Sequence, residues 1–395
     1  MKKAEFQKYE AQYRDELLSR VMPFWEEHSL DREGGGYFTC LTRTGEVFDT
    51  DKFVWPQARQ VWMFAKLYNV LEKRPAWLAV AKHGADFLRQ HGRDNDGNWY
   101  FALTREGNPL TQPCSIFSDC FAAMAFSQYA QATGDREAGE IAVATFENIL
   151  RRRENPSGQW NIVVPGTRPL KAYVLPMILI NVAFEMEGVI SRDQVDRDSE
   201  AGANEVMSLF LDAKHNIVFE GVAPDGSHPD THEGRLTNPG HGIEGMWFVM
   251  DVARRRNDPV LMNRAVDATL SILAYGWDEV YGGIVAFKDF LGKPTDFLEW
   301  DQKFWWVHVE TLVALLMGYA STGRQECWEW FKRVHDYTWR VYPDPVFGEW
   351  FGYLNRRGEV LLPLKGGKWK GCFHIPRALY RCTLEFRQLA ETAKE

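Results

Sequence analysis

The chain has 395 residues, of which 45% are hydrophobic and 14% aromatic, which is ample for a large core. Its net charge is −8 without a long basic run, which argues against nucleic acid or an anionic membrane as a partner. No apolar run reaches the roughly 18 residues that a membrane span needs. The six cysteines contain no C-x-x-C pair and the start shows no signal peptide, so we expect a cytoplasmic protein with reduced thiols.

A short aromatic, strand-like segment followed by a polar turn recurs along the chain. The copies end at turn glycines that are spaced 59 to 66 residues apart, namely Gly45, Gly107, Gly166, Gly226, Gly292 and Gly358. The third copy, residues 159–166, matches the pattern least well. We expect each copy to form a short β-hairpin.

Between successive hairpins the apolar residues follow a helical period and leave room for two helices. The expected helices cover residues 5–28, 53–71, 77–89, 116–130, 137–151, 170–187, 193–210, 239–255, 259–275, 300–320, 326–341 and 375–389. The opening helix would pair with the last one and close a circle. Six helix pairs with hairpins at one end predict an all-α fold, an (α/α)6 barrel, as a single domain over residues 1–395.

In such a ring the helix after each hairpin is the inner one, and its N-terminus opens onto the mouth beside the hairpins. Residues near those six starts are therefore candidates for contact with a substrate. They are Arg59, Asp119, Lys171, His241, Trp305 and His374.

Two of these helix starts carry a histidine. In the stretch from Asn238 to Glu244, Asn238 suits a helix N-cap and Pro239 suits the first turn. His241 then lies at the helix start, and Glu244, three residues on, shares its face. The positive end of the helix dipole is expected to keep His241 neutral. His374 lies at the second such start. Each histidine alone could be structural, but two facing one mouth predict acid–base chemistry.

Four separated motifs carry a family resemblance. They read Phe-Val-Trp-Pro-Gln-Ala-Arg59, Asn-Pro-Gly-His-Gly-Ile-Glu244, Lys303-Phe-Trp-Trp-Val-His-Val-Glu310 and Trp-Lys-Gly-Cys-Phe-His-Ile-Pro-Arg377. In order and spacing they resemble the N-acylglucosamine 2-epimerase family, over about residues 10 to 390. The third inner helix lacks the histidine of the cellobiose 2-epimerases, which favours the N-acetylglucosamine 2-epimerase branch. The resemblance implies the same helical barrel and a homodimer.

The chemistry of such a reaction can be matched to residues. Inverting C2 of an aldose requires ring opening, removal of the proton α to the aldehyde, and return of a proton to the other face of the enediolate. Because one base hardly serves both faces, His241 and His374 are assigned as the two acid–base groups, which the resemblance also implies. Arg59 would stabilise the enediolate oxygens. Glu244 and Glu310 would orient the histidines, bind hydroxyls or assist ring opening.

Other residues are candidates for binding. Those for the sugar are Trp305, Trp306, Trp369, Arg377, Asp119 and Lys171, with the indoles suited to stacking on sugar faces. No metal or cofactor is expected, because the aldehyde itself acidifies C2. The resemblance implies ATP as a non-hydrolysed activator, for which Lys365, Lys368 and Lys370 in a glycine-rich, basic loop are candidates.

Several hypotheses follow for the function. The leading one is interconversion of N-acetylglucosamine (GlcNAc) and N-acetylmannosamine (ManNAc). The second is an epimerase or aldose–ketose isomerase of the same family that acts on mannose or another unacylated sugar. The third is a glycoside hydrolase that would use carboxylates among Asp119, Glu244 and Glu310. A non-catalytic binding role is the last.

Overall fold

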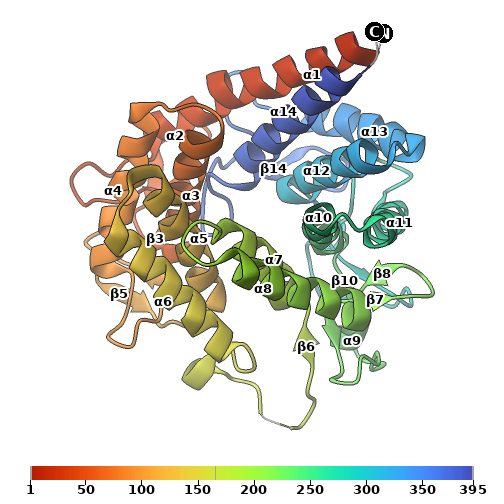
Figure 1. Cartoon of the computed structure of the whole chain (residues 1–395), viewed down its shortest axis with the longest axis horizontal. Coiled ribbons are helices and arrows are strands. Elements are labelled where there is room, and N and C mark those ends of the chain that lie inside the picture. The colour runs from red at the N-terminus through yellow and green to blue at the C-terminus, as the bar shows by residue number, and fades with distance from the viewer. Residues whose placement is uncertain (1, 165, 394–395) are drawn as a thin grey trace.

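Six inner helices form a closed ring in the computed structural model, which describes residues 2–164 and 166–393 (Figure 1). They are α3 (Val54–Val70), α5 (Ile116–Thr133), α7 (Val174–Glu185), α10 (Pro239–Arg256), α12 (Trp305–Thr322) and α14 (His374–Thr392). Each packs against the next, and α14 returns to α3. Most residues of these helices are buried, as expected of helices covered on all sides. The fold is the predicted (α/α)6 barrel.

An outer helix packs behind each inner one. The outer helices are α4 (Pro75–His91), α6 (Arg136–Arg152), α8 (Arg192–Glu205), α11 (Pro259–Gly276), α13 (Gln325–Val341) and α1 (Lys2–Glu16). Helix α1 lies beside α14, so the first and last helices close the circle as predicted (Figure 1). A π-helical turn, Leu17–Val21, joins α1 to α2 (Met22–His28), and a second one, Val206–Phe210, follows α8.

Short antiparallel strands lie at the mouth of the ring. The strands are β1 (Cys40–Leu41), β2 (Val47–Asp49), β3 (Lys52–Phe53), β4 (Ala102–Leu103), β5 (Pro109–Thr111), β6 (Lys171–Ala172), β7 (Leu211–Asp212), β8 (Ile217–Val218), β9 (Gly221–Val222), β10 (Leu236–Thr237), β11 (Lys288–Asp289), β12 (Lys303–Phe304), β13 (Tyr353–Leu354) and β14 (Val360–Leu362). Helix α7 begins four residues later than predicted and helix α12 five residues later. The strands β6 and β12 occupy the residues just before these helices, because they pair with β9 and β13.

The hairpin prediction is confirmed for the first, second and sixth copies and is wrong for the other three. In the fourth and fifth copies, β9 pairs with β6 and β11 pairs with β10, so the strand before each turn has no partner after it. The third copy has no strand among its described residues. Gly158–Trp160 form a 3-10 helix, and none of the described residues in 159–166 belongs to a strand. The side chains of Ile162, Val163 and Val164 are exposed, so no partner strand holds them. The apolar run therefore resembled a strand in sequence but forms an irregular loop before β6.

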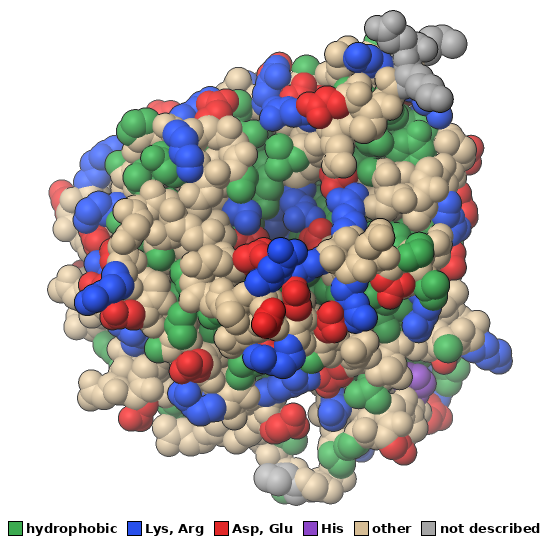
Figure 2. Space-filling model, in the orientation of Figure 1, with side chains coloured by type: hydrophobic (Ala, Val, Ile, Leu, Met, Phe, Trp, Pro, Cys, Tyr) green, Lys and Arg blue, Asp and Glu red, His purple; other side chains and the backbone are tan. Residues whose placement is uncertain are grey.

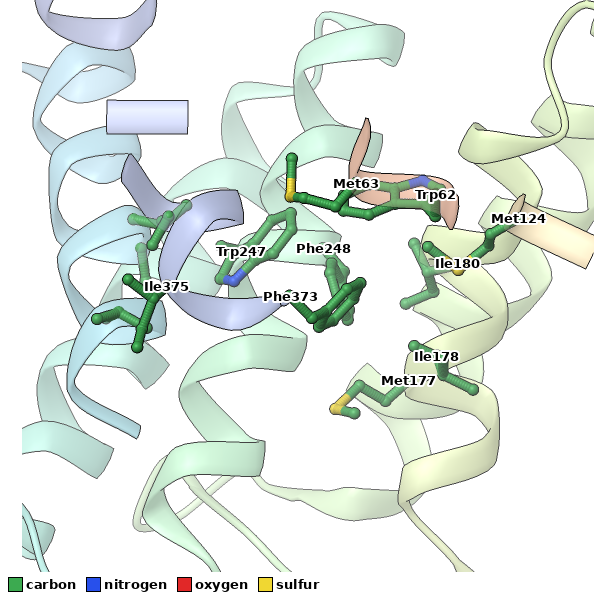
Figure 3. Close-up of a cluster of buried hydrophobic side chains, with 14 of the residues drawn as sticks. Trp62, Met63, Met124, Met177, Ile178, Ile180, Trp247, Phe248, Phe373 and Ile375 are labelled. Carbon is green, nitrogen blue, oxygen red and sulfur yellow. The ribbon is translucent and has the colours of Figure 1, made fainter. Parts of the chain in front are cut away.

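The buried apolar side chains of the inner helices meet in the barrel. Figure 3 shows part of this core, in which Trp62, Trp247, Phe248 and Phe373 lie close to one another. On the face seen in Figure 2, acidic and basic side chains are interspersed without a large patch of one sign. Within residues 2–164 and 166–393, no helix combines the length and apolarity of a membrane span.

Three hairpin arginines link neighbouring units of the ring. The arginine of each turn reaches a buried aspartate of the preceding unit, at 2.7 to 2.9 Å, in the pairs Arg43–Asp344, Arg105–Asp31 and Arg356–Asp278. A buried lysine from the aspartate's own unit completes each site at 2.9 to 3.1 Å, namely Lys365, Lys52 and Lys303. Burial alone would raise the pKa of these carboxyls, but the paired cations hold it well below its usual range.

Replacing Asp344 by Asn should destabilise the fold by about 3 kcal/mol, because Lys365 is left as a buried, unpaired charge. The folded pKa of Asp344 lies below the unfolded value, near 3.9, so its stabilisation is present above about pH 4 and is lost as the pH falls further. D344N should therefore also flatten the acid limb of stability against pH. Urea unfolding between pH 3 and 7 measures both effects. The exposed turn substitution D96N is the control, and an unchanged unfolding midpoint in D344N would contradict the prediction.

Candidate active site

A cavity of about 820 Å3 lies at the hairpin end of the ring. Its lining includes one residue from the first turn of every inner helix, namely Trp55, Phe117, Val174, His241, Trp305 and His374. The starts of all six inner helices therefore lie at the cavity. Of the six residues predicted at those starts, Arg59, His241, Trp305 and His374 line it.

His241 is held at the start of α10 by its backbone and by its ring. Asn238 accepts a hydrogen bond from the backbone N–H of His241 at 3.1 Å, which confirms the predicted N-cap. The Nδ1 atom of the ring lies 3.0 Å from the carboxylate of Glu220, in the turn between β8 and β9. With Nδ1 engaged, Nε2 is the nitrogen available to a substrate.

His374 begins α14 and has a carboxylate partner of its own. Its Nδ1 lies 2.8 Å from Oε1 of Glu310 on α12, and the indole N–H of Trp247 donates to the other Glu310 oxygen at 3.0 Å. The ring of His374 is therefore fixed in orientation, and Nε2 is again the nitrogen left for chemistry.

Arg377 lies one turn after His374 and joins two buried carboxylates. Its guanidinium contacts Glu244 and lies 2.6 Å from Glu310. The ligand atoms of Glu244, Glu310 and His374 lie within 4.8 Å of one another, a spacing that could hold a metal ion. The guanidinium already contacts both carboxylates of that cluster and offsets part of their charge. Glu244 lines the cavity, whereas Glu310 lies behind His374.

The two histidines have opposite pKa shifts. For His241, burial lowers the pKa, but the charge and hydrogen bond of Glu220 together with the charge of Glu244 outweigh it, so the net shift is upward. This corrects the prediction that the helix dipole keeps His241 neutral. For His374, burial and then the charges of Arg59 and Arg377 hold the pKa well below its usual range. One imidazole thus favours the charged form and the other the neutral form.

Arg59 on α3 supplies a cation to the other side of the cavity. The rings of Trp55, Phe121 and Phe373 lie 4.1, 3.9 and 4.5 Å from its guanidinium carbon. Its Nε is buried and finds no hydrogen-bond partner among the described residues. Because a buried, unsatisfied cation is costly, an anionic or carbonyl oxygen in the cavity is the partner that this arrangement favours.

All three predicted tryptophans line the cavity. The Trp306 ring lies 5.0 Å from that of His241 and 5.9 Å from that of His374, so it is placed between the two imidazoles. Trp305 is almost fully buried, whereas Trp369 is 54% exposed at the rim. Trp306 and Trp369 therefore offer a flat surface to a sugar, and Trp305 mainly packs.

Asp119 and Lys171 do not line the cavity, contrary to their prediction as substrate contacts. Phe117 and Phe121 point into it, and Asp119, two residues from each, lies on the opposite face of α5. There Asp119 is buried 3.1 Å from Arg152, and burial raises its pKa to about 7. The ammonium of Lys171 in β6 lies 3.5 Å from Glu205.

The lysines predicted to hold a nucleotide do not form a phosphate loop. Lys365 is buried against Asp344 and two backbone carbonyls, and Lys370 is buried 2.8 Å from Glu349. Both ammonium groups are therefore used inside the protein. Lys368 is exposed and lies over the ring of Trp369, with 4.8 Å between its ammonium and the ring centre.

Sequence reasoning missed Glu220 and the apolar side of the cavity. Glu220 stands in the fourth hairpin copy, and its signal was a charged residue at a position where the other copies carry aromatic or small residues. Val174, Met177 and Ile178 on α7 were read only as helix-forming apolar residues, yet all three line the cavity.

Comparison with known families identifies the class of protein. Residues 36–378 match the family model described as N-acylglucosamine 2-epimerase (GlcNAc 2-epimerase). The match covers most of the chain, so the chain belongs to the N-acylglucosamine 2-epimerase family, a family of epimerases.

Individual relatives agree with this assignment. The N-acylglucosamine 2-epimerase of Rattus norvegicus is 38% identical over 374 residues, covering 92% of this chain and 89% of the relative. That of Bos taurus is 39% identical over 374 residues, covering 92% and 88%. Among solved structures, the cellobiose 2-epimerase of Bacillus thermoamylovorans superposes with a TM-score of 0.83 at 21% identity, over 96% of this chain and 99% of that one. This last likeness concerns the fold.

Proposed function

We propose that the protein interconverts N-acetylglucosamine and N-acetylmannosamine by inversion at C2. The observation that carries the proposal is the pair of histidines on one cavity, each with Nδ1 bound to a carboxylate and Nε2 free for proton transfer. The names of the curated relatives support this choice of sugar. The glycoside hydrolase hypothesis has less support, because Glu244 and Glu310 are both engaged with Arg377.

The two histidines would share one proton in the active form of the enzyme. A neutral imidazole takes the C2 proton of the open-chain sugar, and the charged imidazole returns a proton to the opposite face. The pKa directions favour a resting state with His241 charged and His374 neutral. Arg59 would stabilise the enediolate oxygens, because it lines the cavity and carries a fixed positive charge where negative charge develops.

Proton NMR in deuterated water tests the proposal directly. The protein would be incubated separately with GlcNAc, ManNAc, mannose and cellobiose, each with and without ATP. We expect interconversion of the first two sugars with loss of the C2 proton signal. Turnover that retains protium at C2 would exclude the deprotonation mechanism, and turnover of mannose alone would favour the isomerase hypothesis.

Replacing Glu220 by Gln should move the alkaline limb of kcat/KM to lower pH. Both reaction directions need one proton on the histidine pair, so the alkaline limb reports loss of that proton, which His241 holds more tightly. Without the carboxylate charge the pKa of His241 falls, and the limb falls with it. The shift should be the same in both directions, since each direction uses the singly protonated pair, with the proton on one imidazole or on the other. Rates measured from pH 5 to 10 with each epimer provide the test.

Glu299 supplies a matched control for that experiment. It also lines the cavity, and it makes no hydrogen bond to either histidine in the described part of the chain. E299Q should therefore leave the alkaline limb in place, whatever it does to KM. An unshifted limb in E220Q would show that Glu220 does not tune His241.

We also propose finer properties that follow from the family resemblance. The enzyme would need no cofactor for chemistry, would respond to ATP as a non-hydrolysed activator, and would form a homodimer. A reducing compartment such as the cytoplasm is supported by the six free cysteines, five of which are buried. Assays with and without ATP and light scattering at several protein concentrations test the first three properties.

A further inference from the structure

The buried lysines of the three arginine links lie at different distances from their inner helices. Lys52 and Lys303 each lie two residues before the helix of their unit, α3 and α12. Lys365, which pairs with Asp344 in the equivalent way, lies nine residues before α14. The connecting segment of the sixth unit, residues 366–373, is therefore seven residues longer than in the other two units.

This connecting segment contributes to the cavity and leads directly into His374. Trp369 lines the cavity, and its ring lies 5.5 Å from that of Trp55 at the start of α3. Phe373, the last residue of the segment, is buried in the core with its ring 5.1 Å from that of Trp62 (Figure 3). The segment thus supplies an indole to the rim and sets the point at which α14 begins with His374.

Lys370 holds the connecting segment from inside the protein. Its side chain is fully buried, and its ammonium donates to the carbonyl of Lys365 at 2.8 Å and to the carboxylate of Glu349 at 2.8 Å. The loop between the two lysines is closed a second time, because the Gly367 N–H donates to the carbonyl of Lys370 at 2.9 Å. Since a buried ammonium without partners is costly, these contacts restrict where the segment can lie.

Glu349, the partner of Lys370, is itself fixed in an unusual backbone conformation. The indole N–H of Trp25 donates to its other carboxylate oxygen at 2.7 Å, and its carbonyl accepts from Lys365 at 3.0 Å. Its φ is +45°, in the left-handed region that residues other than glycine rarely adopt. Strain of this kind persists only where the surroundings enforce it, and it clusters at functional sites. Glu349 therefore offers Lys370 a rigid partner.

Lys370 also packs behind the wall of the cavity. A Cβ added to Gly352 would lie 2.6 Å from Cδ of Lys370 and 3.1 Å from the ring of Trp305, so both side chains pack against that glycine. Trp305 lines the cavity, and its ring lies 6.3 Å from that of His374. Lys370 thus supports His374 in two ways, along the chain through residues 371–373 and through space by way of Trp305.

We propose that Lys370, held by Glu349, is a positioning residue for His374. This inference rests on the proposed function and adds a residue that acts on one of its two bases. Lys370 does not line the cavity, so it acts through the connecting segment and not on the sugar. The contacts that hold His241 come from Asn238 and Glu220, far from this segment in the chain, so loss of Lys370 should displace His374 alone.

The test uses the double variant K370M/E349Q and measures a ratio of two rates. Replacing both members of a buried ion pair by neutral groups of similar size often costs little stability, so the variant is expected to fold. Exchange of the C2 proton in deuterated water and epimerisation are followed by NMR from pure GlcNAc and from pure ManNAc. H374N, which retains only His241, and H241N, which retains only His374, identify the epimer whose C2 proton faces each histidine.

The two epimers should respond differently. For the epimer that faces His241, K370M/E349Q should raise the ratio of exchange to epimerisation about tenfold or more, because His241 still removes the proton while a displaced His374 returns one to the other face slowly. For the epimer that faces His374 the ratio should not rise. Both ratios are independent of the amount of folded protein, so they separate positioning from stability.

The control K52M/D31N removes a buried lysine–aspartate pair before α3 and should leave both ratios at their wild-type values. E349Q alone is the milder variant, and it should shift the same ratio in the same direction by a smaller factor. Unchanged ratios in both Glu349 variants, or a rise for the epimer that faces His374, would overturn the positioning role and leave the proposed function intact. A wild-type protein without exchange or epimerisation of either sugar would overturn both.

Discussion

H241N and H374N should each lose epimerisation by about a thousandfold or more, yet each should still exchange the C2 proton of one epimer with solvent. The reason is that the remaining histidine can remove and return a proton on its own face of the sugar. H241N should exchange the epimer whose C2 proton faces His374, and H374N should exchange the other. Deuterium incorporation into GlcNAc and ManNAc, followed separately by NMR, measures this crossed pattern.

The surface histidine His215 supplies the control, since its side chain is 43% exposed and pairs with Asp212 away from the cavity. H215N should behave as wild type in both epimerisation and exchange. Two observations would count against the two-base arrangement. One is epimerisation that survives in either active-site variant, and the other is exchange of the same epimer in both. A protein that only binds sugars would show no exchange in any form.

R377M should reduce the stability of the fold by about 3 to 5 kcal/mol and the activity by about a hundredfold. Removing the guanidinium leaves the carboxylates of Glu244 and Glu310 buried together without their shared cation. Because Arg377 also helps to lower the pKa of His374, its loss should raise that pKa and move the acid limb of kcat/KM to higher pH. Urea unfolding and pH–rate profiles measure the two effects.

The double variant R377M/E244Q separates charge from packing. Neutralising Glu244 removes one of the two negative charges that repel each other in R377M, so part of the lost stability should return. Activity should remain low, because Arg377 no longer fixes Glu310 behind His374. If R377M alone unfolds at the wild-type urea concentration, the buried charge cluster does not stabilise the protein as inferred.

Much of the fold could be predicted because a glycine turn marks the boundary of each repeat in the sequence. Three of the six turn glycines, Gly45, Gly107 and Gly358, lie between paired strands, and the space between successive turns fits two helices of the observed lengths. Residues 159–166 failed because strand pairing depends on a partner, and Ile162 and its neighbours have none. The late starts of α7 and α12 have the same origin, since β6 and β12 pair with distant strands.

The candidate site was predictable where function follows local structure. His241 and His374 stand at helix starts that the sequence itself marks, so their meeting in one cavity followed from the fold. Glu220 was not found, because its role depends on a hairpin placed beside a helix about twenty residues later. Asp119 and Lys365 were misread because their partners, Arg152 and Asp344, are distant in sequence.

Because α1 and α14 close the ring, the fold does not depend on the point in the ring at which the chain begins. Helix α14 runs away from the mouth and α1 runs toward it, so the ends of the two helices far from the mouth are neighbours. A short peptide joining them, with the chain reopened at the exposed turn of Gly134 between α5 and α6, would keep every helix pair and every arginine link. The molecule should therefore tolerate circular permutation.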